Sequence, residues 1–206
     1  MELLVGDLVA VLDGLGIEEA HYYGYSMGGR IGFRIPVYAP ERFASPVLGG
    51  ATYPIQGPED AQDDLLVGIQ RVLEYALAKD ADRAMEAYVA AFEDKFGPVP
   101  PRQKAALLAN DARALLTSVT AFLEPASPMA GEVLPRVALP CLLFAGEADS
   151  RHPSIRECAS RMPNASFFSL PGLDHLQAGL RADLVVTHMK EFLARTTKSK
   201  QSLGPG

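Results

Sequence analysis

The sequence predicts an α/β protein built on a mostly parallel sheet of about four strands. Short apolar runs bounded by glycine or proline alternate with longer runs of helical periodicity, which is typical of βαβ units. Because the crossovers of such units join strands that run in the same direction, the strand pairs are expected to be parallel. The chain has 206 residues, 48% of them hydrophobic and 21% charged, enough for one globular domain or one domain with a small subdomain.

In the first quarter of the chain, the apolar spacing predicts a helix, a strand and a second helix. Residues 3–15 place leucine and valine side chains on one helical face and end at two glycines. Residues 20–25 are aromatic-rich and too few for a helix, so a strand is predicted there. The second helix is expected to start at Gly28 and to end before Pro40, with a kink at Pro36.

The rest of the α/β part continues this alternation. Strands are predicted at residues 44–50, 139–145 and 165–170, and helices at residues 155–162 and 176–195. Pro46 lies inside the first of these strands, although a central strand needs the backbone N–H that proline lacks. The prediction of a strand is kept there despite the proline.

Residues 57–135 have a different character, because good helix formers dominate them and prolines interrupt them. We predict a helical cap of three to five helices inserted into an α/β core of residues 1–56 and 136–197. Residues 198–206 are polar and are expected to form a disordered tail. Seven apolar cap residues could line an acyl pocket, although such residues more often form a cap's own core: Tyr88, Phe92, Phe96, Leu115, Leu116, Phe122 and Leu123.

Charge and composition argue against several kinds of partner. The net charge is −6, and basic residues cluster only in the tail, so we expect no nucleic-acid partner. No apolar run approaches the ~20 residues that a membrane span needs, and residues 1–7 lack the basic segment of a signal peptide. Cys141 and Cys158 do not make a disulfide framework. We therefore expect a soluble, cytoplasmic protein.

Residues 24–29, Gly-Tyr-Ser-Met-Gly-Gly, fall between a predicted strand and a predicted helix and fit the pattern G-x-S-x-G. In that setting a tight turn around the serine leaves no room for side chains two positions before and after it. Gly24 and Gly28 meet this requirement because they have no side chain, and Gly29 permits close packing. The Ser26 hydroxyl would then lie at a helix N-terminus, where backbone N–H groups favour a developing oxyanion. The alternative is a glycine-rich N-cap, in which Ser26 only caps the helix.

A serine hydroxyl needs a base to remove its proton, and four histidines are available. His175 directly follows the last predicted strand, at a carboxyl end where open α/β sheets bind their ligands. We select it as the base, the alternative being that it only caps the final helix. His21 lies within a strand, His188 lies in mid-helix and His152 lies in a loop.

The base in turn needs a carboxylate to orient it, and Asp149 is the one we select. It lies at the carboxyl end of the third predicted strand. Glu147 on the same turn and Asp174 beside His175 are rivals, and Asp149 could instead be a plain N-cap. The chain order Ser26, Asp149, His175 is the order associated with serine elbows between a strand and a helix.

Together these motifs resemble the α/β-hydrolase family. Residues 24–29 resemble its nucleophile elbow, residues 146–149 its acid turn and residues 172–175 its histidine loop. The resemblance runs from Met1 to about Arg195, with the cap as its variable part. It implies a hydrolase of esters or related acyl compounds that needs no metal and no organic cofactor.

The resemblance also implies a role for each residue. Ser26 would attack the carbonyl carbon, His175 would relay the proton, and Asp149 would hold His175. The backbone N–H of Met27 would be one oxyanion donor. The expected function is therefore that of a serine esterase that works through an acyl-enzyme and takes a small-molecule ester.

The family normally has more chain before the elbow, so the resemblance implies a truncated fold that lacks the first strands of an eight-stranded sheet. The second oxyanion donor normally comes from a His-Gly-type loop in that part. Losing one donor typically costs about 10²–10³ in kcat, so a weak esterase is expected. Residues 20–25 would also form an uncovered edge, and exposed edges recruit another chain. We expect a homo-oligomer that covers this edge, which a concentration-independent monomer in sedimentation would contradict.

Other functions use the same three residues. Lactone opening, C–C bond hydrolysis and perhydrolysis are alternatives that the serine motif cannot separate. A non-catalytic protein that binds small molecules on the same fold is a further alternative. Arg30 and Arg151 lie near the proposed site loops and could meet an anionic substrate, although solvated surface arginines are the expected outcome.

Overall fold

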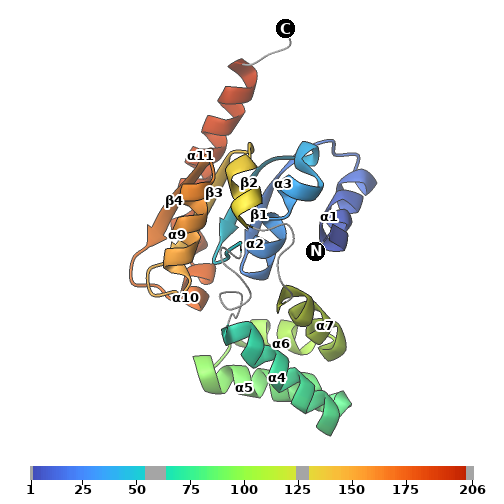
Figure 1. Ribbon diagram of the computed structural model, residues 1–206. Helices are drawn as coiled ribbons and strands as arrows, with labels where there is room; N and C mark the ends of the chain where they lie inside the picture. The colour runs from blue at the N-terminus through green and yellow to red at the C-terminus, as the bar shows by residue number, and fades with distance from the viewer. Residues whose placement is uncertain (1, 54–63, 124–129, 203–206) are drawn as a thin grey trace. The chain divides into compact units, whose positions relative to one another are not determined.

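The computed structural model describes residues 2–53, 64–123 and 130–202, and it divides into two compact units (Figure 1). One is an α/β unit of residues 1–55 and 126–206, and the other is a helical unit of residues 56–125. Residues 130–135, which were predicted to be part of the cap, belong to the α/β unit. The reason is that Ala130, Val133 and Leu134 are buried in its core.

The α/β unit contains one parallel sheet. Its strands are β1 (Ala20–Tyr25), β2 (Phe43–Gly49), β3 (Cys141–Gly146) and β4 (Ala165–Leu170), and they lie side by side in chain order. The predicted fold class is therefore confirmed. Because all four strands run the same way, the segments that follow them emerge at one edge of the sheet. Those segments hold Ser26, Gly50, Asp149 and His175.

Pro46 lies in the central strand β2 without breaking the sheet. Backbone groups of a parallel strand alternate between its two neighbours: Gly49 accepts from the N–H of Ser26 on the β1 side, and the N–H of Gly50 donates to Phe144 on the β3 side. Pro46 is an even number of residues before Gly50, so its missing N–H falls on the β3 side. Pairing with β3 starts only one residue after Pro46, and no ladder bond is lost.

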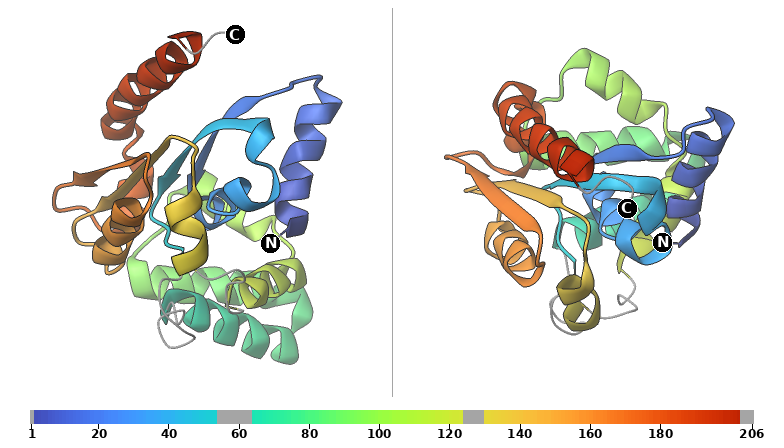
Figure 2. Two further views of the ribbon diagram at one scale, coloured as in Figure 1. Left: turned by 45° about the horizontal axis from the view of Figure 1, so that its top comes forward. Right: turned by 90° about the horizontal axis from the view of Figure 1, so that it is seen from above.

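Helices cover both faces of this sheet (Figure 2). One face packs against α2 (Met27–Gly32), α8 (Ala130–Val133), η3 (Leu134–Arg136) and α9 (His152–Arg161). The other face packs against α10 (His175–Leu180) and α11 (Ala182–Ser202). Helix α1 (Glu2–Gly14) packs with α3 (Ile35–Tyr38) and with the start of β2, and η1 (Pro40–Arg42) leads into that strand. No helix in the described parts of the chain has the length and apolar character needed to cross a bilayer.

Two predicted helices are interrupted. The helix expected from Gly28 is divided into α2 and α3, and Pro36 lies in the first turn of α3, where a helix does not need its N–H. The predicted final helix is divided at Arg181. Helix α11 continues to Ser202, so the prediction of a disordered tail is wrong for residues 198–202, and residues 203–206 lie outside the described residues.

The helical unit contains four α-helices among its described residues, within the predicted three to five. They are α4 (Asp64–Lys79), α5 (Ala84–Phe96), α6 (Pro101–Leu108) and α7 (Ala112–Leu123), with η2 (Ala81–Arg83) between the first two. The core of the unit contains Leu73, Met85, Tyr88 and Val89, with Leu115 and Leu116 packed against it. These leucines therefore belong to the unit's own core.

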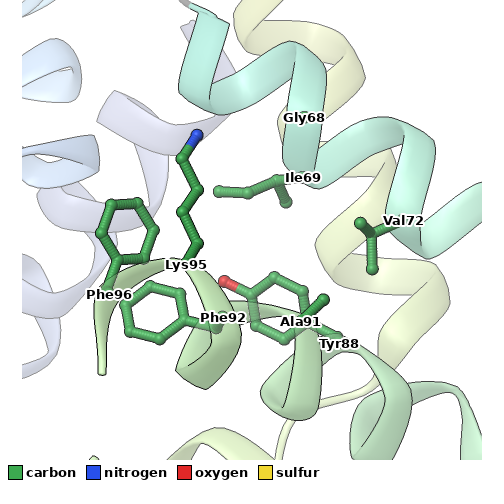
Figure 3. Close-up of a pocket in the computed structure, with 8 residues that line it drawn as sticks. All are labelled: Gly68, Ile69, Val72, Tyr88, Ala91, Phe92, Lys95 and Phe96. Carbon is green, nitrogen blue, oxygen red and sulfur yellow. The ribbon is translucent and has the colours of Figure 1, made fainter. Parts of the chain in front are cut away.

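An apolar pocket of about 110 Å³ lies between α4 and α5 of this unit (Figure 3). Its lining residues are Gly68, Ile69, Val72, Tyr88, Ala91, Phe92, Lys95 and Phe96. Three of the predicted cap aromatics, Tyr88, Phe92 and Phe96, thus line a hollow. The Lys95 ammonium lies over the ring of Phe96, 5.3 Å from its centroid, and is the cationic group of the lining.

Replacing Gly68 by Ala is expected to stabilise the protein. A Cβ at Gly68 would meet no atom within 4 Å, and alanine in a helix interior is favoured over glycine by about 0.5–1 kcal/mol. Urea unfolding should show the gain. As a control, Gly32→Ala in α2 should destabilise by about 1–3 kcal/mol, because its Cβ would press on Leu48 and Tyr22. A loss of stability in Gly68→Ala would contradict the packing described for α4.

Strand β1 is one of the two edge strands of the described sheet, and β4 is the other. Because the N–H of Ser26 faces β2, the alternation places the backbone groups of His21, Tyr23 and Tyr25 on the opposite side. Tyr23 is 48% exposed. A homo-oligomer that pairs at this edge remains our proposal, with sedimentation as its test.

Candidate active site

Ser26 lies in the turn between β1 and α2 with φ 52° and ψ −110°. It is the one non-glycine residue in the described part of the chain with a positive φ. Such backbone costs on the order of 1–3 kcal/mol and is found at functional sites. The Ser26 side chain makes no capping hydrogen bond to α2. The alternative that Ser26 only caps the helix is therefore wrong.

The glycines around Ser26 contribute unequally to this turn. A Cβ at Gly24 would collide with the backbone of Gly28, and one at Gly29 would lie 2.6 Å from the Cβ of Ala51. A Cβ at Gly28 would meet only the Tyr22 hydroxyl, at an ordinary 3.6 Å. The predicted steric needs at Gly24 and Gly29 are thus confirmed, whereas that at Gly28 is wrong.

The structure brings Ser26, His175 and Asp149 together in series. The Oγ of Ser26 lies 3.0 Å from Nε2 of His175, and Nδ1 of His175 lies 2.9 Å from Oδ2 of Asp149. A carboxylate can only accept a hydrogen bond, so Nδ1 carries the proton and Nε2 is free to accept from the serine hydroxyl. That tautomer is the one that a general base needs.

Asp149 is buried, with 4% of its surface exposed, and both of its oxygens are engaged. Its Oδ2 accepts from His175, and its Oδ1 accepts from the backbone N–H of Arg151 at 3.0 Å and from Arg151 Nε at 3.1 Å. Burial raises the pKa of Asp149, but the bonds from His175 and Arg151 and the charge of Arg151 outweigh it and lower the pKa to about 2. The carboxylate therefore stays ionised at neutral pH.

Arg151 was expected to be a solvated surface residue, and that expectation is wrong. Its side chain is only 17% exposed because its guanidinium pairs with Asp149. The signal in the sequence was the position of Arg151 two residues after Asp149, because a turn at that spacing brings the arginine side chain back to the carboxylate. Arg30 lies one helical turn after Ser26, and its N–H donates to the Ser26 carbonyl at 3.1 Å.

The rival carboxylates do not reach the histidine. Asp174 is the N-cap of α10 and accepts from the N–H of Gln177 at 2.8 Å, with the Gln177 side chain completing a capping box. Glu147 is exposed. Since Asp174 caps α10, His175 is free of that task, and its imidazole points to Ser26 and Asp149 instead.

The other histidines have partners outside the site. His21 Nδ1 lies 2.8 Å from the hydroxyl of Ser45, and His152 Nε2 lies 2.8 Å from that of Ser169. His188 stacks on Phe168 with ring centroids 4.1 Å apart. Among the residues that the structure describes, His175 is the histidine that joins a serine to a carboxylate.

Met27 is the first residue of α2, so no carbonyl of that helix can accept its N–H. This donor emerges beside Ser26 and stays our predicted oxyanion donor. In the described ranges, no group of three or more His, Cys, Asp and Glu side chains is arranged to hold a metal ion.

Two residues beside the site were missed in the sequence. The Tyr25 ring stacks on His175, with centroids 5.2 Å apart. Gly50 has φ +58°, and a Cβ there would lie 2.8 Å from Cε1 of the imidazole. The only signal was position, because Tyr25 precedes the serine and Gly50 follows the next strand.

Turnover at Ser26 is expected to need the neutral imidazole, because only an unprotonated Nε2 can accept the serine proton, so kcat/KM should be lower at pH 5 than at pH 9. Asp149, with a pKa of about 2, adds no second limb in this range. Burial and the charge of Asp149 raise the pKa of Tyr25 above its ordinary value, so no falling limb is expected below about pH 9. A flat profile of kcat/KM from pH 5 to 9 would contradict the assigned base.

The fold and the site define an α/β protein in which a serine on a strand–helix turn, a histidine and an aspartate meet at the carboxyl edge of a parallel sheet. Residues 2–132, well over half of the chain, match the family model described as the alpha/beta hydrolase fold. The chain therefore belongs to the alpha/beta hydrolase fold family, and the resemblance seen in the sequence is confirmed.

Individual relatives are more distant. A protein of Bacillus subtilis (strain 168), provisionally named 2-succinyl-6-hydroxy-2,4-cyclohexadiene-1-carboxylate synthase, is 24% identical over 181 residues. The alignment covers 83% of this chain, which spans 64% of that relative's length.

Solved structures show the same fold. An esterase from Thermogutta terrifontis is 17% identical with a TM-score of 0.71, covering 95% of this chain and 72% of the other. The enol-lactonase from Burkholderia xenovorans LB400 is 22% identical with a TM-score of 0.69, covering 94% and 72%. At these identities the likeness shows the fold alone, because one fold hosts many reactions.

Proposed function

We propose that this protein is a serine hydrolase that cleaves carboxylic esters through an acyl-enzyme on Ser26. The observation that carries the proposal is the pair of hydrogen bonds that joins Ser26 to His175 at 3.0 Å and His175 to Asp149 at 2.9 Å. Two further features support it. The positive φ of Ser26 is a backbone strain of the kind that is concentrated at functional sites. The pKa of Asp149 is lowered by specific partners, as is common for groups in active sites.

In the proposed reaction, Ser26 Oγ attacks the ester carbonyl carbon while Nε2 of His175 takes the hydroxyl proton. The oxyanion that forms accepts a hydrogen bond from the N–H of Met27. The alcohol leaves with the proton from His175, and the acyl group stays on Ser26. Water then attacks the acyl carbon, gives its proton to His175, and releases the acid as Ser26 regains a proton.

The test combines covalent labelling with turnover. A fluorophosphonate should form an adduct on the peptide that contains Ser26, and p-nitrophenyl acetate should be hydrolysed faster than by Ser26→Ala. Ser169→Ala is the matched control, because Ser169 also lies 2.8 Å from a histidine nitrogen but outside the site. Unlabelled Ser26, with hydrolysis no faster than in Ser26→Ala, would favour the non-catalytic binding protein.

A second candidate is chemistry on a carboxylate-bearing substrate, with the same serine and histidine. It is favoured by the position of Arg30, one turn after Ser26 on α2, and by the carboxylate in the name of the Bacillus relative. Comparing p-nitrophenyl acetate with mono-p-nitrophenyl succinate tests it. The candidate requires that the wild type prefers the anionic ester and that Arg30→Gln loses this preference. If the ratio of the two rates is the same in the wild type and in Arg30→Gln, the candidate is rejected.

A further inference from the structure

Tyr25, the residue before Ser26, contacts His175 in two ways. Its ring lies against the imidazole, with centroids 5.2 Å apart and planes 25° apart. Its hydroxyl donates a hydrogen bond to the backbone carbonyl of His175 and lies 3.5 Å from Nδ1. One side chain thus restrains both the backbone and the ring of the histidine.

The Tyr25 ring itself is held in a slot walled by glycines. A Cβ at Gly49 would lie 2.5 Å from its Cδ2, one at Gly50 2.8 Å from its Cζ, and one at Gly179 2.7 Å from its Cε1. The ring of Phe144 packs beside it, with centroids 5.7 Å apart. The end of β2, the residue that follows it and helix α10 therefore leave room for this ring at one place, which is against His175.

The orientation of His175 matters because its two hydrogen bonds leave from different ring nitrogens. Nδ1 meets Asp149 and Nε2 meets Ser26 at a single rotation of the ring. His175 is the first residue of α10, a helix of only six residues, so its own helix constrains it weakly. A contact from a strand of the sheet supplies the restraint that this short helix lacks.

We propose that Tyr25 is a positioning residue, which holds His175 where Nδ1 faces Asp149 and Nε2 faces Ser26. The inference rests on the proposed function, because it gives Tyr25 a part in the same site. Tyr25 acts through His175 and touches no reacting atom in this arrangement.

Tyr25→Phe removes the hydrogen bond to the His175 carbonyl and keeps the stacked ring. We expect kcat for p-nitrophenyl acetate to fall about 10-fold, because small displacements of a catalytic group cost rate, with KM changed by less than about twofold. Tyr25→Leu removes the stacking too and should lower kcat about 100-fold. Tyr23→Phe is the matched control, since Tyr23 lies on the same strand and packs on Phe144, whereas the ring stacked on His175 is that of Tyr25. Its kcat should be unchanged.

A second variant reaches the same ring without altering it. Gly179→Ala should favour α10 by helix propensity, yet its Cβ would push the Tyr25 ring away. We therefore expect a folded protein whose kcat is also lowered about 10-fold. This variant keeps the proposal open to refutation if Tyr25→Leu does not fold.

Proton NMR separates positioning from general stability. The Nδ1–H of His175, bonded to Asp149, should give a low-field resonance that persists in Tyr23→Phe and broadens or disappears in Tyr25→Phe. If Tyr25→Phe had a kcat within twofold of the wild-type value and an unchanged resonance, the inference for Tyr25 would be overturned. Should the wild type hydrolyse no faster than Ser26→Ala, the proposed function fails, while the resonance still decides whether Tyr25 positions the histidine.

Discussion

Replacing His175 by alanine is expected to lower kcat for p-nitrophenyl acetate by about 10³–10⁴-fold, and more than Asp149→Ala does. In the proposed reaction, the imidazole accepts the serine proton directly across the 3.0 Å contact between Nε2 and Oγ. Asp149 acts only through it, by fixing the tautomer and stabilising the imidazolium. Steady-state kinetics of both variants against the wild type measure the difference.

Asp174→Ala is the matched control for this pair. Asp174 is a carboxylate next to His175 in the chain, but its side chain caps α10. Its removal should therefore lower stability by about 0.5–2 kcal/mol, the usual loss of an N-cap, and leave most of the turnover. If Ser26→Ala, Asp149→Ala and His175→Ala all kept the activity of the wild type, the observed hydrolysis would not be catalysed at this site.

Gly24→Ala is expected to disrupt the turn that presents Ser26. The added Cβ would collide with the backbone of Gly28 and lie 2.8 Å from Cε1 of Tyr22. Backbone cannot yield as a flexible side chain can, so the turn must open and the Ser26 hydroxyl must leave His175. We expect the fluorophosphonate labelling rate to fall by about 100-fold or more, and stability to fall by about 1–3 kcal/mol.

Gly28→Ala provides the comparison, because its Cβ would only reach van der Waals contact with Tyr22. Urea unfolding should show a much smaller loss of stability in Gly28→Ala than in Gly24→Ala. Wild-type stability and full labelling in Gly24→Ala would show that the turn is looser than the contacts around Gly24 imply.

Much of the sheet was predictable because each strand is a short apolar run with glycine or proline at its ends. Residues 20–25 and 165–170 form strands with the predicted bounds, and the other two strands differ by one or two residues. Helix boundaries were harder to predict, because packing decides where a helix breaks. The local pattern predicted neither the break between α10 and α11 at Arg181 nor the extension of α11 to Ser202.

The three candidate side chains were also found from local patterns, each following a different strand. Parallel strands bring their carboxyl ends to one edge of a sheet, so Ser26, Asp149 and His175 could be expected near one another. Their distances, the role of Arg151 as the partner of Asp149, and the unequal needs of the glycines could not be read from those patterns.

The alternation of strands and helices can be predicted from the order of the amino acids, and so can the edge of the sheet where polar residues gather. Which carboxylate faces the histidine, and which glycines the Tyr25 ring requires, follow from the packing of the folded chain. The two kinds of feature depend on interactions over different distances along the chain. Strand and turn preferences act within a few residues, whereas hydrogen-bond geometry across segments more than a hundred residues apart depends on how the whole sheet and its helices pack.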